Sequence, residues 1–322
     1  MEQLFEIGRR TFDTPGFRGL EFIEVEAKSI INHVPHAQFH FEWTINPYRG
    51  CSHGCTFCFA RPTHTYMDMN AGRDFETKIV VKVNAVDVLR KDLKAKRWKG
   101  AHIAMGTATD PYQRAEGKYR LMPGIIEALT EFRNPFSILT KGTLILRDLP
   151  LLVAAREVAE VSTAMSIPTL DQGVWKTSEP GTPHPRKRME AVARMNEAGI
   201  PCGVMMMPIL PGLSDHPDML RETATAAAEA GATFITTGWL HLRPVVREHF
   251  MEWLQTEHPD LVARYHDMYP RTYASTADNR ALERRMEAIK AEVGYRPRLR
   301  PRWRAAVPDA RTEQDPEQLS LL

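Results

Sequence analysis

The segment FHFEWTINPYRGCSHGCTFC, residues 39–58, joins an apolar strand pattern to a loop that holds three of the chain's four cysteines. Cys51, Cys55 and Cys58 follow a C-x3-C-x2-C spacing, and two glycines allow the loop to turn tightly. Four cysteines in 322 residues are too few for a disulfide framework. We expect a reducing cytoplasm, where a tight cysteine cluster indicates a metal site rather than disulfides.

Three kinds of site are compatible with this loop. A structural zinc site needs a fourth ligand, for which His53 and His64 are candidates. A redox dithiol uses two cysteines and leaves the third without a role. A [4Fe–4S] cluster held by three thiolates leaves one iron without a protein ligand. That iron can chelate the amino and carboxylate groups of a small molecule, and the chemistry favours this third kind of site.

Around the loop, short apolar runs alternate with helical patterns. The predicted strands cover residues 39–45, 102–105, 136–139, 161–166, 202–209 and 233–240, and the predicted helices cover residues 84–93, 121–132, 144–158, 185–198 and 218–230. Strands separated by helices run parallel. Six strand–helix units are too few for a closed eightfold barrel, so we predict an α/β fold, a partial (β/α)6 TIM-like barrel with a helical C-terminal extension. The β-branched run 78–83 is set aside as an excursion from the barrel.

Four regions follow from this pattern. They are an N-terminal extension (1–38), the barrel (39–245), a helical C-terminal region (246–293) and an Arg/Pro-rich flexible tail (294–322). The tail carries arginines at alternate positions from Arg296 to Arg304, together with Trp303. A basic arm with an aromatic residue can contact a phosphate backbone, but tails of this composition are more often solvated.

The composition excludes several classes of protein. The chain has 42 Lys and Arg against 40 Asp and Glu, a formal net charge of +2. This balance gives no global electrostatic case for binding nucleic acid or a membrane surface. No apolar stretch is long enough to span a bilayer, and the first residues lack the pattern of a signal peptide. We therefore expect a cytoplasmic protein without a membrane partner, and nucleic acid is not the favoured partner.

The cysteine loop and four motifs resemble the radical S-adenosylmethionine (radical SAM) superfamily, and within it the spore photoproduct lyase-like branch. An aromatic residue, Phe57, precedes the third cysteine, as is usual in the superfamily. The motifs similar to the branch are Asn-Pro-Tyr-Arg-Gly-Cys (46–51), Thr-Asp-Pro-Tyr-Gln (109–113), Leu-Thr-Lys-Gly (139–142) and Pro-Ile-Leu-Pro-Gly (208–212). The resemblance covers roughly residues 40–245.

The resemblance implies a radical SAM enzyme with a [4Fe–4S] cluster on Cys51, Cys55 and Cys58 and with SAM chelated to the remaining iron. One electron, supplied by a donor such as flavodoxin or ferredoxin, would cleave SAM reductively to methionine and a 5′-deoxyadenosyl radical. That radical would abstract a hydrogen atom from the substrate, and the protein would hold the target close and exclude water. The resemblance leaves the substrate open.

It also implies contacts to SAM at the strand ends, where barrels collect their reactive groups. Phe57 would lie against the adenine, Lys141 would pair with the methionyl carboxylate, and Ser166 would bond the ribose hydroxyls. Thr107 and Asp110 would receive the methionyl ammonium. Many members carry a Gly-Glu pair in that loop, and here it reads Gly-Thr.

The substrate-side candidates are Tyr112, Gln113 and Arg243, each of which follows a predicted strand. Spore photoproduct lyase returns a hydrogen atom to its substrate from a cysteine outside the cluster, whereas the loop 106–113 here has no cysteine. Cys202 lies in a predicted core strand, and we expect it to be buried. A DNA-lesion repair lyase is therefore an alternative function, and a zinc-stabilised nucleic-acid-binding protein is another.

Overall fold

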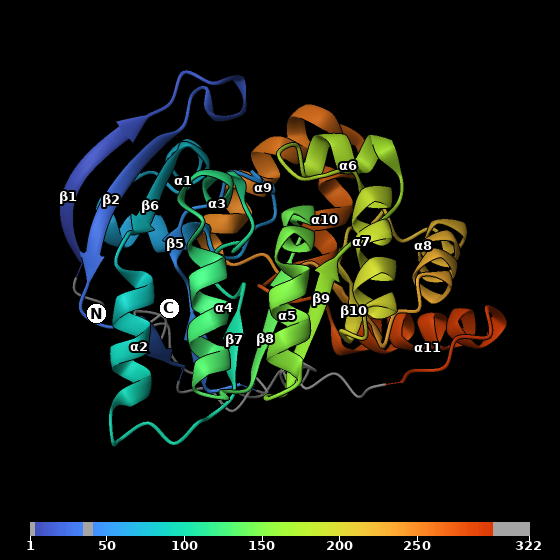
Figure 1. The fold of residues 1–322 in the computed structure, drawn as a ribbon. Helices are drawn as coiled ribbons and strands as arrows, with labels where there is room; N and C mark the ends of the chain where they lie inside the picture. Colours follow the sequence, from blue (N-terminus) through green and yellow to red (C-terminus); the bar gives the residue numbers. More distant parts are fainter. Residues whose placement is uncertain (1–3, 35–40, 299–322) are drawn as a thin grey trace.

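The computed structural model describes residues 4–34 and 41–298 (Figure 1). Its larger sheet has the strand order β11-β10-β9-β8-β7-β4-β3. The strands are β3 (Ile31–His33), β4 (Trp43–Ile45), β7 (Ile103–Met105), β8 (Phe136–Thr140), β9 (Val161–Ser166), β10 (Cys202–Ile209) and β11 (Ile235–Trp239). Neighbours from β4 to β11 pair in parallel, and β3 pairs antiparallel with β4 at one edge. The parallel strands follow one another in chain order, which confirms the predicted α/β fold and its partial barrel.

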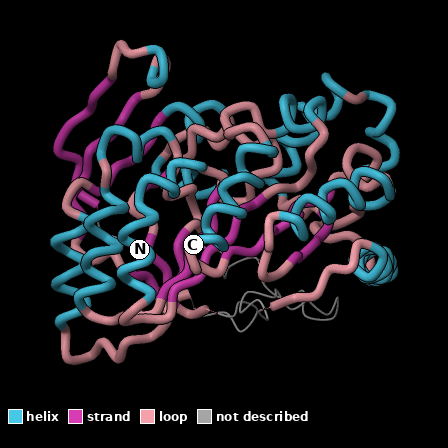
Figure 2. Tube along the Cα trace, turned by 45° about the vertical axis from the view of Figure 1, so that its right-hand side comes forward, coloured by secondary structure: helices cyan, strands magenta, loops and turns pink. Residues whose placement is uncertain are grey.

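Helices connect the parallel strands and cover the sheet. They are α2 (Ala85–Lys94), α3 (Arg114–Tyr119), α4 (Leu121–Glu131), α5 (Leu149–Arg156), α6 (Gln172–Ser178), α7 (Pro185–Glu197) and α8 (Pro217–Glu229). In Figure 1 the strands β7, β8 and β9 point upward, toward the level of α3 and α6, and α4 and α5 lie in front of them. Figure 2 shows helices on both sides of the strands. The carboxyl ends of the strands therefore meet in one region, on the side of the sheet toward α3 and α6.

Two predicted elements differ in detail. Of the strand predicted over 39–45, residues 39 and 40 lie outside the described residues, and the strand is observed from Trp43. The helix predicted over 144–158 is a 3-10 helix, η3 (Thr143–Asp148), followed by α5. Pro150 lies in the first turn of α5, where its missing N–H costs no hydrogen bond. A proline in the middle of a continuous helix would remove one, so the α-helix begins at Leu149.

The structure has a second sheet, which the sequence pattern did not predict. It has the order β1-β2-β6-β5, with β1 (Leu4–Thr11), β2 (Glu21–Ala27), β5 (Tyr48–Arg49) and β6 (Lys78–Lys82). The run 78–83 is thus not an excursion but the strand β6, which pairs in parallel with β2 and antiparallel with β5. The core of this sheet includes the buried side chains of Phe22, Ile79 and Val81. Because β5 ends just before Cys51, this sheet holds one end of the cysteine loop.

Helices after β11 complete the described chain. They are α9 (Pro244–Glu257), α10 (Val262–Met268) and α11 (Thr276–Glu292). α11 packs against α8 and β11, and α9 packs against η2 (Arg61–Met67), the 3-10 helix that follows the cysteine loop. None of the helices in the described residues is long and apolar enough to cross a membrane. The prediction for the tail arginines beyond Arg298 and for Trp303 falls outside the described residues.

Candidate active site

The cysteine loop lies between β5 and η2 and is closed by its own backbone hydrogen bonds. Gly54 N donates to Cys51 O (3.3 Å), and Cys58 N donates to Cys55 O (3.2 Å). Cys51 N donates to Phe75 O (2.9 Å), which ties the loop to α1 (Arg73–Thr77). Cys51 and Cys55 are buried, Cys58 is partly exposed, and all three are free of disulfides. One short loop thus presents three thiols.

Gln113 holds the loop from the side of β7. Its Oε1 accepts from Ser52 N (3.0 Å), and its Nε2 donates to Gly50 O (2.9 Å). The same carbonyl accepts from Thr109 Oγ1 (2.6 Å). The Gln113 side chain is fully buried. This residue was predicted as a substrate-side candidate, and the structure places its amide against the backbone of the cysteine loop.

Arg61 also holds the loop, at Cys55, and the sequence pattern did not single it out. Its Nε and Nη2 donate to Cys55 O (3.2 and 2.8 Å), and its Nη1 donates to the carbonyls of Ala71 and Gly72 (both 3.1 Å). It also pairs with Glu76. The guanidinium is fully buried and therefore crosslinks the cysteine loop to the segment that leads into α1.

A third support is the segment 178–182, which links α6 to α7. Thr56 N donates to Ser178 O (3.0 Å), and Gly181 N donates to His53 O (2.9 Å). A Cβ added at Gly181 would lie 2.2 Å from Ser52 O and 2.8 Å from His53 O. Both atoms belong to the backbone, so only glycine allows this approach.

Three of the predicted SAM contacts come together at the ends of β8 and β9. Lys141 Nζ donates to Ser166 Oγ (2.7 Å) and lies 5.6 Å from the centroid of the Phe57 ring. The ammonium also pairs with Glu179, which the sequence pattern did not single out. The residues predicted to bind the adenine, the ribose and the carboxylate of SAM therefore form one group.

Glu179 is a buried carboxylate that bridges two cations. Its second oxygen accepts from Arg188 Nη2 (2.7 Å), and Arg188 Nη1 donates to Ser166 O (2.7 Å). Burial raises the pKa of Glu179, but the charges of Arg188 and Lys141 outweigh this and leave the pKa below its ordinary value. Glu179 is therefore an anion, and the group of Lys141, Glu179 and Arg188 carries a net charge of +1.

Asp110 joins the loops that follow β7 and β8. Its carboxylate accepts from Lys141 N (2.7 Å), Thr140 Oγ1 (2.5 Å) and Tyr112 N (2.9 Å), and His53 Nδ1 lies 3.3 Å away. Burial raises the pKa of Asp110, but the His53 charge and these hydrogen bonds lower it further than burial raises it. Through its hydrogen bond from Lys141 N, the Asp110 carboxylate orients the backbone at Lys141.

Thr107 lies beside Asn46 at the other end of the same loop. The two side chains lie within hydrogen-bond distance (Asn46 Nδ2 to Thr107 Oγ1, 3.3 Å), and Ala108 N donates to Asn46 Oδ1 (3.1 Å). Gly106 begins this loop with φ +87°, and a Cβ there would lie 1.9 Å from Leu139 O. The glycine lets the β7 loop lie directly on the end of β8. Neither Thr107 nor Asp110 has a hydrogen bond to Ser166 or to the Lys141 ammonium among the contacts of the described residues.

The remaining substrate-side candidates differ in exposure. The Tyr112 side chain is only 2% exposed, and burial together with the nearby Asp148 raises its pKa well above the usual value. Arg243 is partly exposed and caps the amino end of α9, four residues after β11 ends at Trp239. Its guanidinium has no hydrogen-bond or ion-pair partner among residues 4–34 and 41–298. Arg243 is therefore the candidate whose side chain is available to a ligand.

Of the two histidines proposed for a zinc site, His53 lies beside both Asp110 and the Cys51 side chain. His64 Nε2 lies 2.9 Å from Lys78 O, and its ring packs edge-on against Phe75. In the part of the chain that the structure describes, no three His, Cys, Asp or Glu side chains converge on the position of one metal ion.

The donor set of the loop fits an iron–sulfur cluster. A cubane takes one thiolate per iron and does not need its ligands to converge on one ion. Burial raises the pKa of Cys55 well above its ordinary value and that of Cys58 to about 11, and the nearby Lys141 charge partly offsets both shifts. The thiols would therefore release their protons on binding iron, as metal sites of this kind do.

Cys202 is fully buried, as predicted, and burial raises its pKa to about 12. It is the first residue of β10, an eight-residue strand. Cys202 pairs with Thr163, three residues before Ser166, so at about 3.3 Å per residue it lies roughly 10 Å before the level of Ser166 along the strands. The cysteine therefore lies at the amino end of β10, inside the barrel core rather than at the strand ends.

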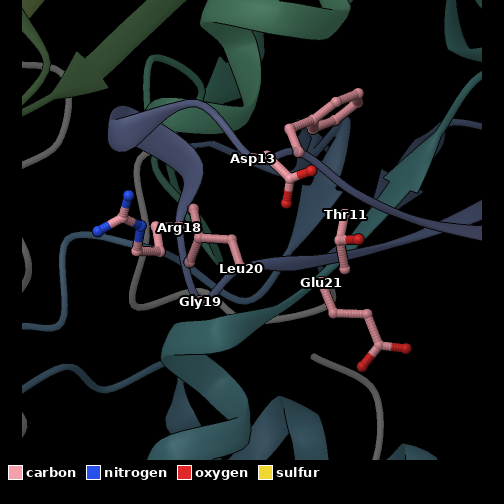
Figure 3. Close-up of a pocket in the computed structure, with 7 residues that line it drawn as sticks. Thr11, Asp13, Arg18, Gly19, Leu20 and Glu21 are labelled. Carbon is pink, nitrogen blue, oxygen red and sulfur yellow. The ribbon is translucent and has the colours of Figure 1, made fainter.

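A separate surface hollow lies at the turn of the β1–β2 hairpin and is lined by Thr11, Phe12, Asp13, Arg18, Gly19, Leu20 and Glu21. Figure 3 shows that Asp13, Arg18 and Glu21 point in different directions around it. Because its charged groups do not converge on one point, the hollow is a poor candidate for the active site.

Comparisons with known proteins agree with this geometry. The family model described as Radical SAM superfamily matches residues 45–225, more than half of the chain. An uncharacterized protein of Mycobacterium tuberculosis strain H37Rv is 44% identical over 97% of this chain and 91% of that protein. An uncharacterized protein of Methanocaldococcus jannaschii is 30% identical over 63% of this chain and 73% of its own length.

Among solved structures, spore photoproduct lyase complexed with dinucleoside spore photoproduct superposes with a TM-score of 0.63 at 15% identity, over 84% of this chain and 79% of that chain. A mutant of the same enzyme with bound AdoMet and dinucleoside spore photoproduct gives a TM-score of 0.60 at 15% identity, with the same coverage. At this level of identity the likeness concerns the fold.

Proposed function

Because this chain belongs to the radical SAM superfamily and is a radical SAM enzyme, we propose that Cys51, Cys55 and Cys58 hold a [4Fe–4S] cluster at which SAM is cleaved reductively. The observation that carries the proposal is the group of Lys141, Ser166 and Phe57, which lies at the strand ends beside the cysteine loop. Held by these cysteines, the cluster would supply the electron that cleaves SAM and so provide radical chemistry for hydrogen abstraction from the substrate.

The residues of the chain then have distinct tasks. The Lys141 ammonium holds the methionyl carboxylate as a point charge, with the Ser166 hydroxyl beside it for the ribose. The Phe57 ring covers the adenine side. Gln113 and Arg61 hold the cysteine loop in place through buried hydrogen bonds to its backbone. Their burial keeps water away from the loop, which protects a reactive radical from side reactions.

We propose Thr107 and Asp110, in the loop that follows β7, as the residues near the SAM ammonium. The Asp110 carboxylate already accepts three hydrogen bonds that join the β7 and β8 loops. We propose that Asp110 acts mainly by orienting the backbone of Lys141.

We propose Arg243, at the amino end of α9, as a contact of the substrate. Tyr112 and Gln113 support the strand-end loops from buried positions. A one-electron donor of the flavodoxin or ferredoxin class and a cytoplasmic location complete the proposal, because the cytoplasm keeps thiols reduced. We propose no DNA-lesion lyase activity, since Cys202 lies at the far end of β10.

Anaerobic reconstitution with iron and sulfide should give protein with about four irons per chain. With a strong reductant, this protein should convert SAM to 5′-deoxyadenosine and methionine, which chromatography of the reaction detects. A preparation that takes up one zinc per chain and leaves SAM intact would contradict the proposal and would favour the zinc-stabilised alternative.

Lys141→Ala should weaken the binding of SAM by about tenfold to a hundredfold, because a hydrogen bond to a charged group is worth about 1.5–3 kcal/mol. The iron content should stay the same, since Lys141 has no hydrogen bond to the cysteine loop among the described contacts. Equilibrium binding of SAM to the reconstituted protein measures the effect. Lys187→Ala is the control, because Lys187 is an exposed lysine of α7 that pairs with Glu190. Loss of iron in Lys141→Ala would instead assign Lys141 a structural role.

A further inference from the structure

Glu179 lies between Lys141 and Arg188 and pairs with both. We propose that Glu179 is a positioning residue that holds the Lys141 ammonium at the place where the carboxylate of SAM binds. The inference rests on the proposed function, because it concerns the same cofactor contact. It adds a residue that neither the cysteine motif nor the strand-end pattern indicates.

The geometry around Lys141 leaves its ammonium little freedom. A lysine side chain is a flexible stem that can place its charge in many positions. Here the ammonium donates to Ser166 Oγ (2.7 Å), pairs with Glu179 and faces the Phe57 ring. The Ser166 hydroxyl is itself held, since it donates to Met207 O (3.2 Å). Three fixed neighbours therefore define one position for the charge.

Glu179 is fixed from its other side by Arg188. The Arg188 guanidinium is fully buried and donates to the second oxygen of Glu179 (2.7 Å) and to Ser166 O (2.7 Å). One arginine thus bonds the Glu179 carboxylate and the backbone of Ser166, the two residues to which the Lys141 ammonium donates. Preorganised charges of this kind need no rearrangement when a ligand arrives.

The charges also fit a ligand with one negative group. Lys141, Glu179 and Arg188 together carry a net charge of +1 in a buried setting. A buried charge is unfavourable unless it is paired, and one carboxylate from a ligand would balance this group. Glu179 therefore lowers the charge of the site to the value that a single carboxylate neutralises.

Glu179 also fixes the distance between Lys141 and the cysteine loop. Ser178, which precedes Glu179, and Gly181, two residues after it, form hydrogen bonds with the backbone of Thr56 and His53. The same five-residue segment therefore touches the loop with its backbone and touches Lys141 with its carboxylate. We infer that this segment sets where the SAM carboxylate lies relative to the cluster cysteines.

The test uses two ligands, SAM and decarboxylated SAM, on the reconstituted protein. The variant is Glu179→Gln with Arg188→Met, which removes one negative and one positive charge and keeps the net charge of the group at +1. Replacing a buried ion pair by residues of similar volume often preserves stability. We expect SAM to bind about tenfold more weakly, as for loss of one well-placed charged contact, and decarboxylated SAM to bind within about twofold of the wild type.

Equal weakening of both ligands would show that Glu179 only supports the fold and would overturn the proposal. Unchanged binding of SAM would overturn it as well. The Lys141→Ala variant distinguishes failure of the Glu179 proposal from failure of the proposed function. It should weaken the binding of SAM more than that of decarboxylated SAM whether or not Glu179 has a positioning role. If Lys141→Ala weakens the binding of both ligands equally, Lys141 does not contact the SAM carboxylate. That result would contradict both the proposed contact and the positioning role of Glu179.

A second variant covers the case in which the double variant does not fold. Glu179→Asp keeps the charge but shortens the side chain by one methylene group, so its carboxylate cannot reach both Lys141 and Arg188 in their present positions. It should again weaken SAM more than decarboxylated SAM. Glu222→Gln is the control, because Glu222 pairs with Arg186 on the surface, where such pairs contribute little.

Discussion

Replacing Cys51, Cys55 or Cys58 with alanine, one at a time, is expected to abolish SAM cleavage and to leave the reconstituted protein with far fewer than about four irons per chain. Each thiolate would bind a different iron, and no further cysteine lies on the loop to replace it. The fold should persist, because the loop is also held by Gln113 and Arg61 through buried hydrogen bonds. Iron analysis after anaerobic reconstitution and chromatography for 5′-deoxyadenosine measure the two effects.

Cys202→Ala is the matched control for these variants. Its side chain is buried at the amino end of β10, so alanine should cost only stability, about 1 kcal/mol for a small cavity. Iron content and SAM cleavage should equal those of the wild type. A loop variant that keeps its full iron content, or a Cys202 variant that loses it, would show that the cluster ligands are assigned wrongly.

The sequence allowed the barrel to be predicted because its signal is local. Each strand is a short apolar run followed by a helical pattern, and parallel strands in chain order need no further information. The same reasoning placed Lys141 and Ser166 at strand ends. Their proximity in the structure follows from the pairing of β8 with β9, which brings the two strand ends side by side.

The second sheet could not be predicted from the sequence, because its strands pair with segments that are distant in the chain. β2 and β6 pair in parallel, although the paired residues, such as Glu21 and Lys78, lie 57 positions apart in the chain. Nothing in the run 78–83 tells which strand it joins, since a short apolar strand pattern fits any open sheet edge. The sequence pattern therefore left the run 78–83 outside the barrel. It also gave the N-terminal extension no strand to pair with.

The supporting side chains of the site were missed for a related reason. Glu179 and Arg188 lie in a turn and on a helix, where charged residues are typical of the solvated surface. Only the fold shows that both are buried and that they face Lys141. Gln113 shows the converse: its position after a strand indicated a ligand contact, but its side chain turns toward Gly50 and Ser52.

These supports share one physical feature, which is that they act on the backbone of the cysteine loop. Gln113, Arg61 and the segment 178–182 bond to its carbonyls and amides and leave its thiols free. A loop held in this way keeps its shape without using the atoms that would bind iron. This arrangement predicts that damage to a support changes iron binding even when every cysteine is present.

Gly181→Ala is the sharpest case of such damage. The added Cβ would lie 2.2 Å from Ser52 O and 2.8 Å from His53 O, distances at which the backbone of one segment has to move. Overpacking of this kind costs about 1–3 kcal/mol. Because Gly181 N donates to His53 O (2.9 Å), the shift should displace the residues between Cys51 and Cys55. We expect the protein to fold but to retain less than about half of the iron that the wild type binds.

The measurement is iron per chain after identical reconstitution, together with the midpoint of thermal unfolding without iron. Gly117→Ala is the control, because the nearest atom to its added Cβ would be Phe17 Cζ at 3.9 Å, an ordinary contact. Alanine in that helix should raise stability by up to about 1 kcal/mol and leave the iron content unchanged. Full iron binding in Gly181→Ala would mean that the segment 178–182 only rests against the loop. Selective loss of iron with a nearly normal unfolding midpoint would show that the segment shapes the loop for its cluster.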